Sequence, residues 1–209
     1  RGTSQMVLRN YGQALATVLP TVWPAETGRC VEVGLFSRYP VLRVLAGERA
    51  ITSGPLQGDY RVEFANGNAL DIHSEGELFL LNHKLVARLD REEYVARVLD
   101  REAKPEPAEA AKALAVAIRT YLLQNAARSG DCLSIDDSST RQRVAPRPAS
   151  AESRSIAAWT ADLVLAGSIV TYHSDQPGPD KLAWQQAVEQ ANAGQRYDAI
   201  LLHAYPRAS

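Results

Sequence analysis

The 209-residue chain has no marked excess of charge and no long apolar run. Its 23 Lys and Arg residues nearly balance its 24 Asp and Glu residues, which leaves a formal net charge of −1. Such a chain has no strong cationic field for nucleic acid or for an anionic membrane surface. Its apolar runs are shorter than the ~18 residues that a membrane span needs. With 45% hydrophobic and 22% charged residues, the composition is typical of a globular protein and excludes a collagen-like, coiled-coil or disordered chain.

Several motifs that carry familiar chemistry are also missing. The sequence holds neither GxGxxG nor GxxxxGK[ST], so no nucleotide-binding loop is predicted. The GxSxG and HExxH motifs are absent as well. The histidines lie far apart in the sequence, whereas a catalytic zinc needs about three clustered protein ligands; they are His73, His83, His173 and His203. We therefore expect no metal site and no other cofactor.

Cysteine is scarce, with only Cys30 and Cys132. Their separation of 102 positions excludes a local metal knuckle or a CxxC redox pair. Two separate buried thiols and one long-range disulfide both remain open. A disulfide would require an oxidising compartment. The chain begins with Arg1 rather than with methionine, and we expect a periplasmic or secreted protein whose signal peptide has been removed.

The first half of the chain changes from a helical to a strand-like pattern. Apolar residues at three- and four-residue spacing predict an amphipathic helix over 6–19, within an N-terminal helix-and-linker segment 1–27. Short alternating apolar runs from about Cys30 to Leu89 predict strands. Asn66-Gly67 between two such runs is a strong hairpin signal. We expect a small, mainly antiparallel sheet over 28–90.

The region 91–209 is predicted to be mostly helical and to complete one domain over 28–209. Asp90 is a suitable N-cap for a first helix that ends near Glu102, and an alanine-rich second helix follows from about Pro107. Beyond these helices we expect a polar loop, a strand pair, a third helix and a short final segment, over 143–155, 162–173, 182–193 and 197–205. The predicted fold class is α+β, with a helix pair beside the sheet region.

The spacing of the charged residues in the helix pair, taken alone, indicates only a structural role for them. Lys112 and Arg119 are seven positions apart, which places them on one face of the second helix. Periodicity does not distinguish Glu102 from the other acidic residues. On this basis Glu102 is a surface charge and Arg119 belongs to a structural ion pair.

The order of the motifs, however, resembles the SpoIID/LytB family of sporulation and cell-wall proteins that act on peptidoglycan. In that family a segment of the type EYVxGVVxxEM-P precedes EALKAQAVAARTYAL, and DTTHCQ, YHSSSGG and a closing SYxEIL-YYP follow. The corresponding segments here are EYVARVLDRE (93–102), AKALAVAIRTY (111–121), DSSTRQ (137–142), IVTYHS (169–174) and AGQRYDAIL (193–201). The helix pair is the specific part of a resemblance that covers roughly residues 28–209.

This resemblance implies a lytic transglycosylase that cleaves peptidoglycan glycan strands, with Glu102 as the catalytic acid and then base. Such an enzyme forms 1,6-anhydro-muramic ends. One carboxyl group suffices for this reaction, because no water is consumed. The acid must hold a proton near neutral pH, which requires a partly apolar cleft. The residues that the resemblance assigns to substrate binding are Lys112, Arg119, Gln142, Tyr172, His173 and Ser174. His173 also fits a structural role in a strand.

The family carries a Cys pair and a His in a zinc-like arrangement, and here Asp136 and Arg141 stand at the likely Cys positions. An alternative is therefore a non-catalytic peptidoglycan-binding or amidase-enhancing module with an envelope protein as partner. A scaffold without glycan contact is a third possibility.

Overall fold

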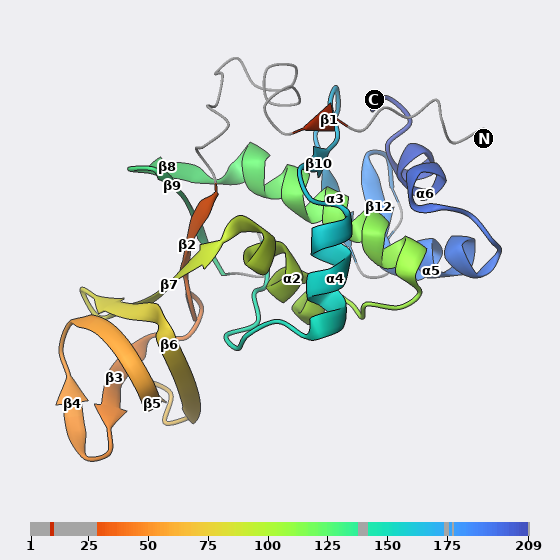
Figure 1. The fold of residues 1–209 in the computed structure, drawn as a ribbon. Coiled ribbons are helices and arrows are strands. Elements are labelled where there is room, and N and C mark those ends of the chain that lie inside the picture. The colour runs from red at the N-terminus through yellow and green to blue at the C-terminus, as the bar shows by residue number, and fades with distance from the viewer. Residues whose placement is uncertain (1–8, 11–28, 138–141, 174–175, 177, 209) are drawn as a thin grey trace.

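A large, mostly antiparallel sheet forms the first half of the fold in the computed structural model, which describes residues 9–10, 29–137, 142–173, 176 and 178–208 (Figure 1). Its strands are β2 (Cys30–Gly34), β3 (Val41–Ala46), β4 (Arg49–Ile51), β5 (Gly54–Phe64), β6 (Ala69–Leu81), β7 (Lys84–Asp90), β8 (Ala127–Ser129) and β9 (Cys132–Asp136). They lie in the order β4-β3-β5-β6-β7-β2-β9-β8, and only β2 and β9 pair in parallel. The predicted α+β class is confirmed.

The hairpin predicted at Asn66-Gly67 joins β5 to β6. Glu63 pairs with Ala69 across the turn, and the Asn66 side chain accepts a hydrogen bond from the Asn68 N–H at 2.9 Å. Gly67 has a positive φ of 88°, which suits glycine because it has no Cβ. The residue pattern therefore fixes both the position of this turn and the register of the two longest strands.

The helices gather around α3 (Ala108–Asn125), whose side chains from Ala110 to Ile118 are buried apart from Lys112. The others are α2 (Arg91–Glu102), α4 (Ala151–Trp159), α5 (Trp184–Asn192) and α6 (Tyr197–Ala204), and each of them contacts α3. Alanines on α3 allow these neighbours to approach its backbone closely. Asp90 caps α2 as predicted, since its side chain accepts the Glu92 N–H at 3.0 Å. Among the described residues, no helix is long and apolar enough to cross a membrane.

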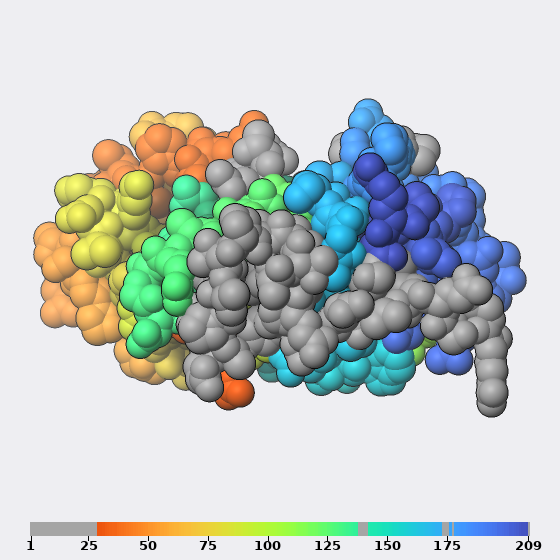
Figure 2. All heavy atoms as spheres, turned by 90° about the horizontal axis from the view of Figure 1, so that it is seen from above, coloured from red at the N-terminus to blue at the C-terminus, as the bar shows by residue number. Residues whose placement is uncertain are grey.

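The sheet and the C-terminal helices lie at opposite ends of the molecule. Figure 2 shows the strands of the N-terminal half in orange and yellow at one end and the last helices in blue at the other. The helix pair α2 and α3 follows β7 directly and leads back to β8 and β9 (Figure 1). The helix pair thus connects the sheet with the C-terminal helices, and side chains at the ends of these two helices lie near both parts.

Three local predictions were wrong. The segment 143–155 is not all loop, because Ser150 caps α4 by accepting the Ser153 N–H at 3.2 Å. The final segment, for which no element was predicted, forms helix α6. The two strands predicted within 162–173 do not pair with each other. Instead β10 (Leu163–Val164) pairs with β1 (Arg9–Asn10), and β11 (Thr171–His173) pairs in parallel with β12 (Lys181–Ala183). At residues 9–10 a strand therefore replaces the predicted N-terminal helix, and the rest of that helix lies outside the described residues.

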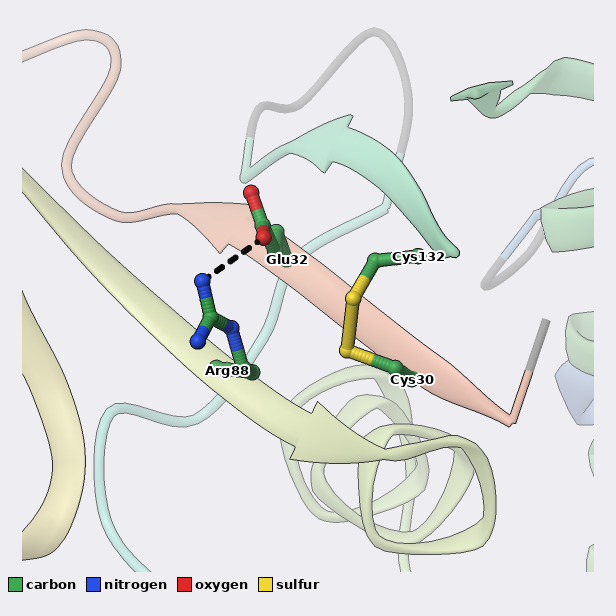
Figure 3. The surroundings of a disulfide bond; sticks show 4 residues. All are labelled: Cys30, Glu32, Arg88 and Cys132. Carbon is green, nitrogen blue, oxygen red and sulfur yellow. Dashed lines mark hydrogen bonds and ion pairs between the residues drawn. A yellow bond between two sulfur atoms is a disulfide. The ribbon is translucent and has the colours of Figure 1, made fainter. Parts of the chain in front are cut away.

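Cys30 and Cys132 form a disulfide, which settles the alternative that the sequence left open (Figure 3). The two residues are register partners on the parallel strands β2 and β9, with their Cα atoms 4.6 Å apart. On the other side of β2, Glu32 accepts a hydrogen bond from Arg88 of β7 at 3.0 Å. Strand β2 is thus held to both neighbours, and the disulfide closes a loop of 102 residues that contains α2 and α3.

Replacing both cysteines by serine should lower the free energy of unfolding by up to ~4–5 kcal/mol, because the denatured chain regains the freedom of a long loop in the chain-entropy model. Urea unfolding with and without a reductant measures this difference. The double variant is the control, since reductant should not change its midpoint. Equal midpoints for the oxidised and reduced wild-type protein would contradict the prediction.

Candidate functional site

Glu102 ends α2 and is paired with Arg143. The Glu102 carboxylate accepts hydrogen bonds from the Arg143 backbone N–H at 3.0 Å and from its Nε at 3.3 Å and Nη2 at 3.2 Å. The Glu102 side chain is only 16% exposed, whereas that of Arg143 is 45% exposed. Hydrogen bonding and the charge of Glu102 raise the pKa of Arg143. Glu102 is therefore a sheltered carboxylate, and among the described residues the half-exposed guanidinium group of Arg143 covers it.

A chain of buried hydrogen bonds lies behind this pair and joins α2, α3 and β11. Gln142 is fully buried, and its Oε1 accepts a hydrogen bond from the Tyr94 hydroxyl. Gln142 Nε2 donates to the Tyr172 hydroxyl at 2.9 Å and to the Ile118 carbonyl at 3.2 Å. The structure thus brings Gln142 and Tyr172 together at the Glu102 end of α2.

Both tyrosine hydroxyls keep their protons at any physiological pH. Removal from water raises the pKa of Tyr172 well above its usual range, and the charge of Glu102 raises it further. Removal from water also raises the pKa of Tyr94, with the charge of Asp137 as the next cause. These hydroxyls can therefore act as hydrogen-bond donors around the site, but not as bases.

A groove of about 840 Å³ opens beside the pair, and Arg143 lines it. One part of its wall is aromatic, with the Phe36 and Phe64 rings 5.1 Å apart and the Tyr39 and Phe64 rings 6.4 Å apart. Its charged lining residues are Arg38, Asp100, Arg101, Asp137 and Arg143. A groove with aromatic and charged walls suits a ligand that combines apolar faces with polar groups, as sugars do.

Asp137 supplies a second carboxyl group in this groove. Asp137 directly follows β9, and its Oδ1 accepts a hydrogen bond from the Val144 N–H at 3.0 Å. Burial raises the pKa of Asp137; hydrogen bonds from Val144 and Phe36 and the charge of Arg101 oppose this shift, and the charge of Glu102 adds to it. The sequence marked Asp137 only as the first residue of the DSSTRQ segment and assigned it no role in the site.

Arg119 does not line the groove, and its predicted role in substrate binding stays a prediction. It is fully buried, and its Nη2 donates to Glu92 at 2.5 Å and to Thr160 at 3.1 Å. Its Nη1 donates to the Leu163 carbonyl at 2.9 Å. Burial alone would raise the pKa of Glu92, but Arg119 and Arg91 lower it. Arg119 is thus the structural ion pair that helical spacing alone favoured.

Lys112 lies on a different surface from Glu102. Its Nζ is 2.8 Å from Glu109 and 3.8 Å from the centre of the Trp159 ring, which also contacts Tyr197. No contact in the described part of the chain connects Lys112 with Glu102 or the groove. The side chain of His173 and all of Ser174 lie outside the described residues.

The described residues contain no group of three or more His, Cys, Asp or Glu side chains that could hold a metal ion. The described groups of the site are two carboxyl groups, the guanidinium group of Arg143 and the neutral hydrogen-bond donors Tyr94, Gln142 and Tyr172.

Sequence reasoning missed Arg143, which follows Gln142 directly. Nothing in residue spacing marks one arginine in an irregular segment as the partner of a helix-terminal glutamate 41 positions earlier. Only the fold brings the two together.

Replacing Arg119 by methionine should destabilise the protein by roughly 3–5 kcal/mol, because it leaves Glu92 largely buried with one partner fewer. Replacing Arg43 by methionine is the control, since Arg43 pairs with Glu63 at a site where its side chain is 58% exposed. Thermal or urea unfolding of the two variants gives the comparison. Similar losses of unfolding free energy in both variants would show that the buried Arg119–Glu92 pair stabilises the protein no more than an exposed pair does.

Comparison with known proteins places these elements in a family. The profile of the SpoIID family, described as "Stage II sporulation protein", matches residues 82–193, which include both α2 and α3. A second family, described as "Predicted secreted protein (DUF2300)", matches residues 180–209.

The "Uncharacterized protein YfaQ" of Escherichia coli (strain K12) is 52% identical over 211 residues, which cover 98% of this chain. This chain spans only 38% of the length of that relative. No solved structure matches the chain significantly.

Proposed function

Because the chain belongs to the SpoIID family, we propose that it cleaves the glycan strands of peptidoglycan as a lytic transglycosylase. The family has a cell-wall-related role, and the second match is to a family of secreted proteins. Both agree with a periplasmic or extracellular site of action, where the Cys30–Cys132 disulfide is stable.

The position of Glu102 carries this proposal. Its carboxyl group is 16% exposed and lies directly behind Arg143, at the edge of a groove with aromatic and charged walls. A sheltered carboxyl group next to a groove is the minimum that proton transfer to a glycosidic oxygen requires. In this setting Glu102 can serve first as the acid and then as the base.

In the proposed reaction, protonated Glu102 gives its proton to the oxygen that links N-acetylmuramic acid to N-acetylglucosamine. The bond from C1 to that oxygen breaks, and the C6 hydroxyl oxygen of the muramic residue bonds to C1. Glu102 then takes the proton of this hydroxyl group, so the carboxyl group ends as it began. The products are a free N-acetylglucosamine hydroxyl and a 1,6-anhydro-muramic end, and no water is consumed.

The neighbouring groups can assist this reaction without taking part in proton transfer. Gln142 holds Tyr94 and Tyr172 in place, and the Tyr172 hydroxyl stays protonated close to the charge of Glu102. Tyr172, His173 and Ser174 are proposed to contact sugar hydroxyls, as their place in the IVTYHS segment suggests. Lys112 is proposed only as a contact for a longer glycan, because it lies away from the groove beside Trp159.

A second candidate function is a non-catalytic peptidoglycan-binding or amidase-enhancing module within an envelope complex. The ion pair between Glu102 and Arg143 supports it, because the guanidinium group occupies the carboxylate that a catalytic function needs. The presence of Asp136 and Arg141 at the family's likely Cys positions points the same way.

Replacing Glu102 by glutamine should abolish cleavage of peptide-free glycan strands, with a loss of at least ~100-fold, because the amide cannot transfer the proton. Mass spectrometry of the digests detects anhydro-ended fragments. The control is Glu109→Gln, which removes a carboxylate from α3 that pairs with Lys112. If the wild-type protein binds the strands but leaves them intact, the binding module is the better description.

A further inference from the structure

We infer that Asp137 is a second catalytic carboxyl group, which activates a water molecule so that the protein also hydrolyses the glycosidic bond that Glu102 protonates. The inference rests on the proposed function and goes beyond it, because hydrolysis is a different reaction with a different product. It follows from the place of Asp137 in the groove and from the way in which its carboxyl group is held.

Asp137 is the carboxyl group of the groove that can still accept hydrogen bonds from a ligand. Two acidic side chains among the described residues line the groove, and one of them, Asp100, is committed to Ser150, whose N–H and hydroxyl donate to it at 2.7 and 2.8 Å. Asp137 accepts hydrogen bonds from the backbone N–H groups of Val144 and Phe36. Because a carboxylate has about four acceptor positions, Asp137 can also accept a hydrogen bond from water or a sugar hydroxyl.

Consecutive residues hold the two carboxyl groups of the site. Glu102 accepts the Arg143 N–H at 3.0 Å, and Asp137 accepts the Val144 N–H at 3.0 Å. Since one residue of extended chain spans at most about 3.6 Å, the two accepting oxygen atoms lie within about 10 Å of each other. In glycosidases that invert the sugar, the two carboxyl groups are roughly 6.5–9.5 Å apart, which leaves room for a water molecule. The fold therefore allows the spacing that a water-consuming reaction needs.

The two carboxyl groups come from different parts of the molecule. Glu102 ends α2 among the helices, whereas Asp137 follows β9 of the sheet and is held by Phe36, which lies just beyond β2. A sugar in the groove therefore meets Glu102 from the helical part and Asp137 from the sheet. Inverting hydrolysis needs this arrangement, because water attacks the face of the sugar opposite the protonated oxygen.

The surroundings of Asp137 suit a general base. Burial raises the pKa of Asp137, and the charge of Glu102 adds to this rise. Hydrogen bonds from Val144 and Phe36 and the charge of Arg101 oppose it, because they stabilise the carboxylate form. A base becomes more effective as its pKa rises toward the working pH. Asp137 is thus a stronger base than an aspartate in water and is already oriented by two backbone groups.

In the inferred hydrolysis, Glu102 gives its proton to the glycosidic oxygen, and the bond from C1 to that oxygen breaks. Asp137 takes a proton from a water molecule, and the oxygen of that water bonds to C1. The products are a free N-acetylglucosamine hydroxyl and a muramic residue with a hydroxyl group at C1. One proton has moved from Glu102 to Asp137, and exchange with the solvent restores both carboxyl groups. Hydrolysis thus differs from the anhydro-forming reaction in which oxygen attacks C1.

The test measures both products in one digest of peptide-free glycan strands whose own reducing ends have first been converted to alcohols with borohydride. The digest is run in water enriched in the heavy oxygen isotope. Mass spectrometry then separates labelled reducing ends, which hydrolysis forms, from unlabelled anhydro ends. The wild-type protein should form both. Asp137→Asn should lower the ratio of labelled to anhydro ends by ~100-fold, because the amide cannot take a proton from water.

Asp136→Asn is the matched control. Asp136 ends β9, its side chain is exposed, and it is not among the residues that line the groove. This variant should keep the wild-type ratio. If Asp137→Asn does not fold, Asp137→Glu should lower the ratio instead, because it moves the carboxyl group by one methylene. An unchanged ratio in the folded Asp137 variant, or equal loss of both products, would overturn the role of Asp137 as the base that activates water.

The two products separate this inference from the proposed function. Anhydro ends without labelled reducing ends from the wild-type protein would leave the transglycosylase proposal intact and overturn the role of Asp137. Labelled reducing ends alone, lost in Asp137→Asn, would overturn the transglycosylase proposal and support Asp137. Strands that stay intact would overturn both.

Discussion

The packing of α2 against α3 is the constraint on which the site depends. The buried Arg119 of α3 binds Glu92 of α2, and Gln142 connects Tyr94 of α2 with the Ile118 carbonyl of α3. These two neighbouring polar connections hold the first turn of α2 against the C-terminal half of α3. The C-terminal residue of α2, Glu102, therefore has one defined position relative to the groove. Because each connection is buried, its loss would leave a polar group without a partner, which makes sliding of one helix along the other costly.

The sheet contributes the opposite wall of the same groove. Phe36 and Tyr39 follow β2, and Phe64 ends β5, so three chain segments distant in sequence supply the aromatic surface. Strand β2 is anchored on both sides, by hydrogen bonding to β7 and by the disulfide to β9. Asp137 follows β9 and thereby joins the anchored strands to the segment that holds Arg143. The groove is thus formed between two rigid parts, and its charged residues come from the connections between them.

Local signals in the sequence identified the parts of the fold that local interactions determine. The Asn66-Gly67 turn, the Asp90 cap and the alanine-rich helix each result from residues within a few positions of one another. Helix α4 was missed because the Pro- and Ser-bearing residues before Ser150 dominated the pattern. Its cap is completed from elsewhere, by Asp100 of α2, which accepts hydrogen bonds from the Ser150 N–H and hydroxyl at 2.7 and 2.8 Å. No local pattern contains such a contact, and the same holds for the pair between Glu102 and Arg143. The resemblance to the family indicated Glu102, whereas only the fold could show what covers it.

An arginine at a family motif position, such as Arg119, can serve either a ligand or the scaffold. Burial distinguishes the two roles here. A guanidinium group that already donates to Glu92, Thr160 and the Leu163 carbonyl has its hydrogen-bonding capacity used within the protein. Arg143 shows the opposite arrangement, with one carboxylate partner and a half-exposed side chain at the groove. The two arginines thus have different roles. The buried Arg119 holds the helix that carries Glu102, and the half-exposed Arg143 lies where it can meet a ligand in the groove. A chain that keeps the first and varies the second retains the same scaffold while changing which ligands reach Glu102.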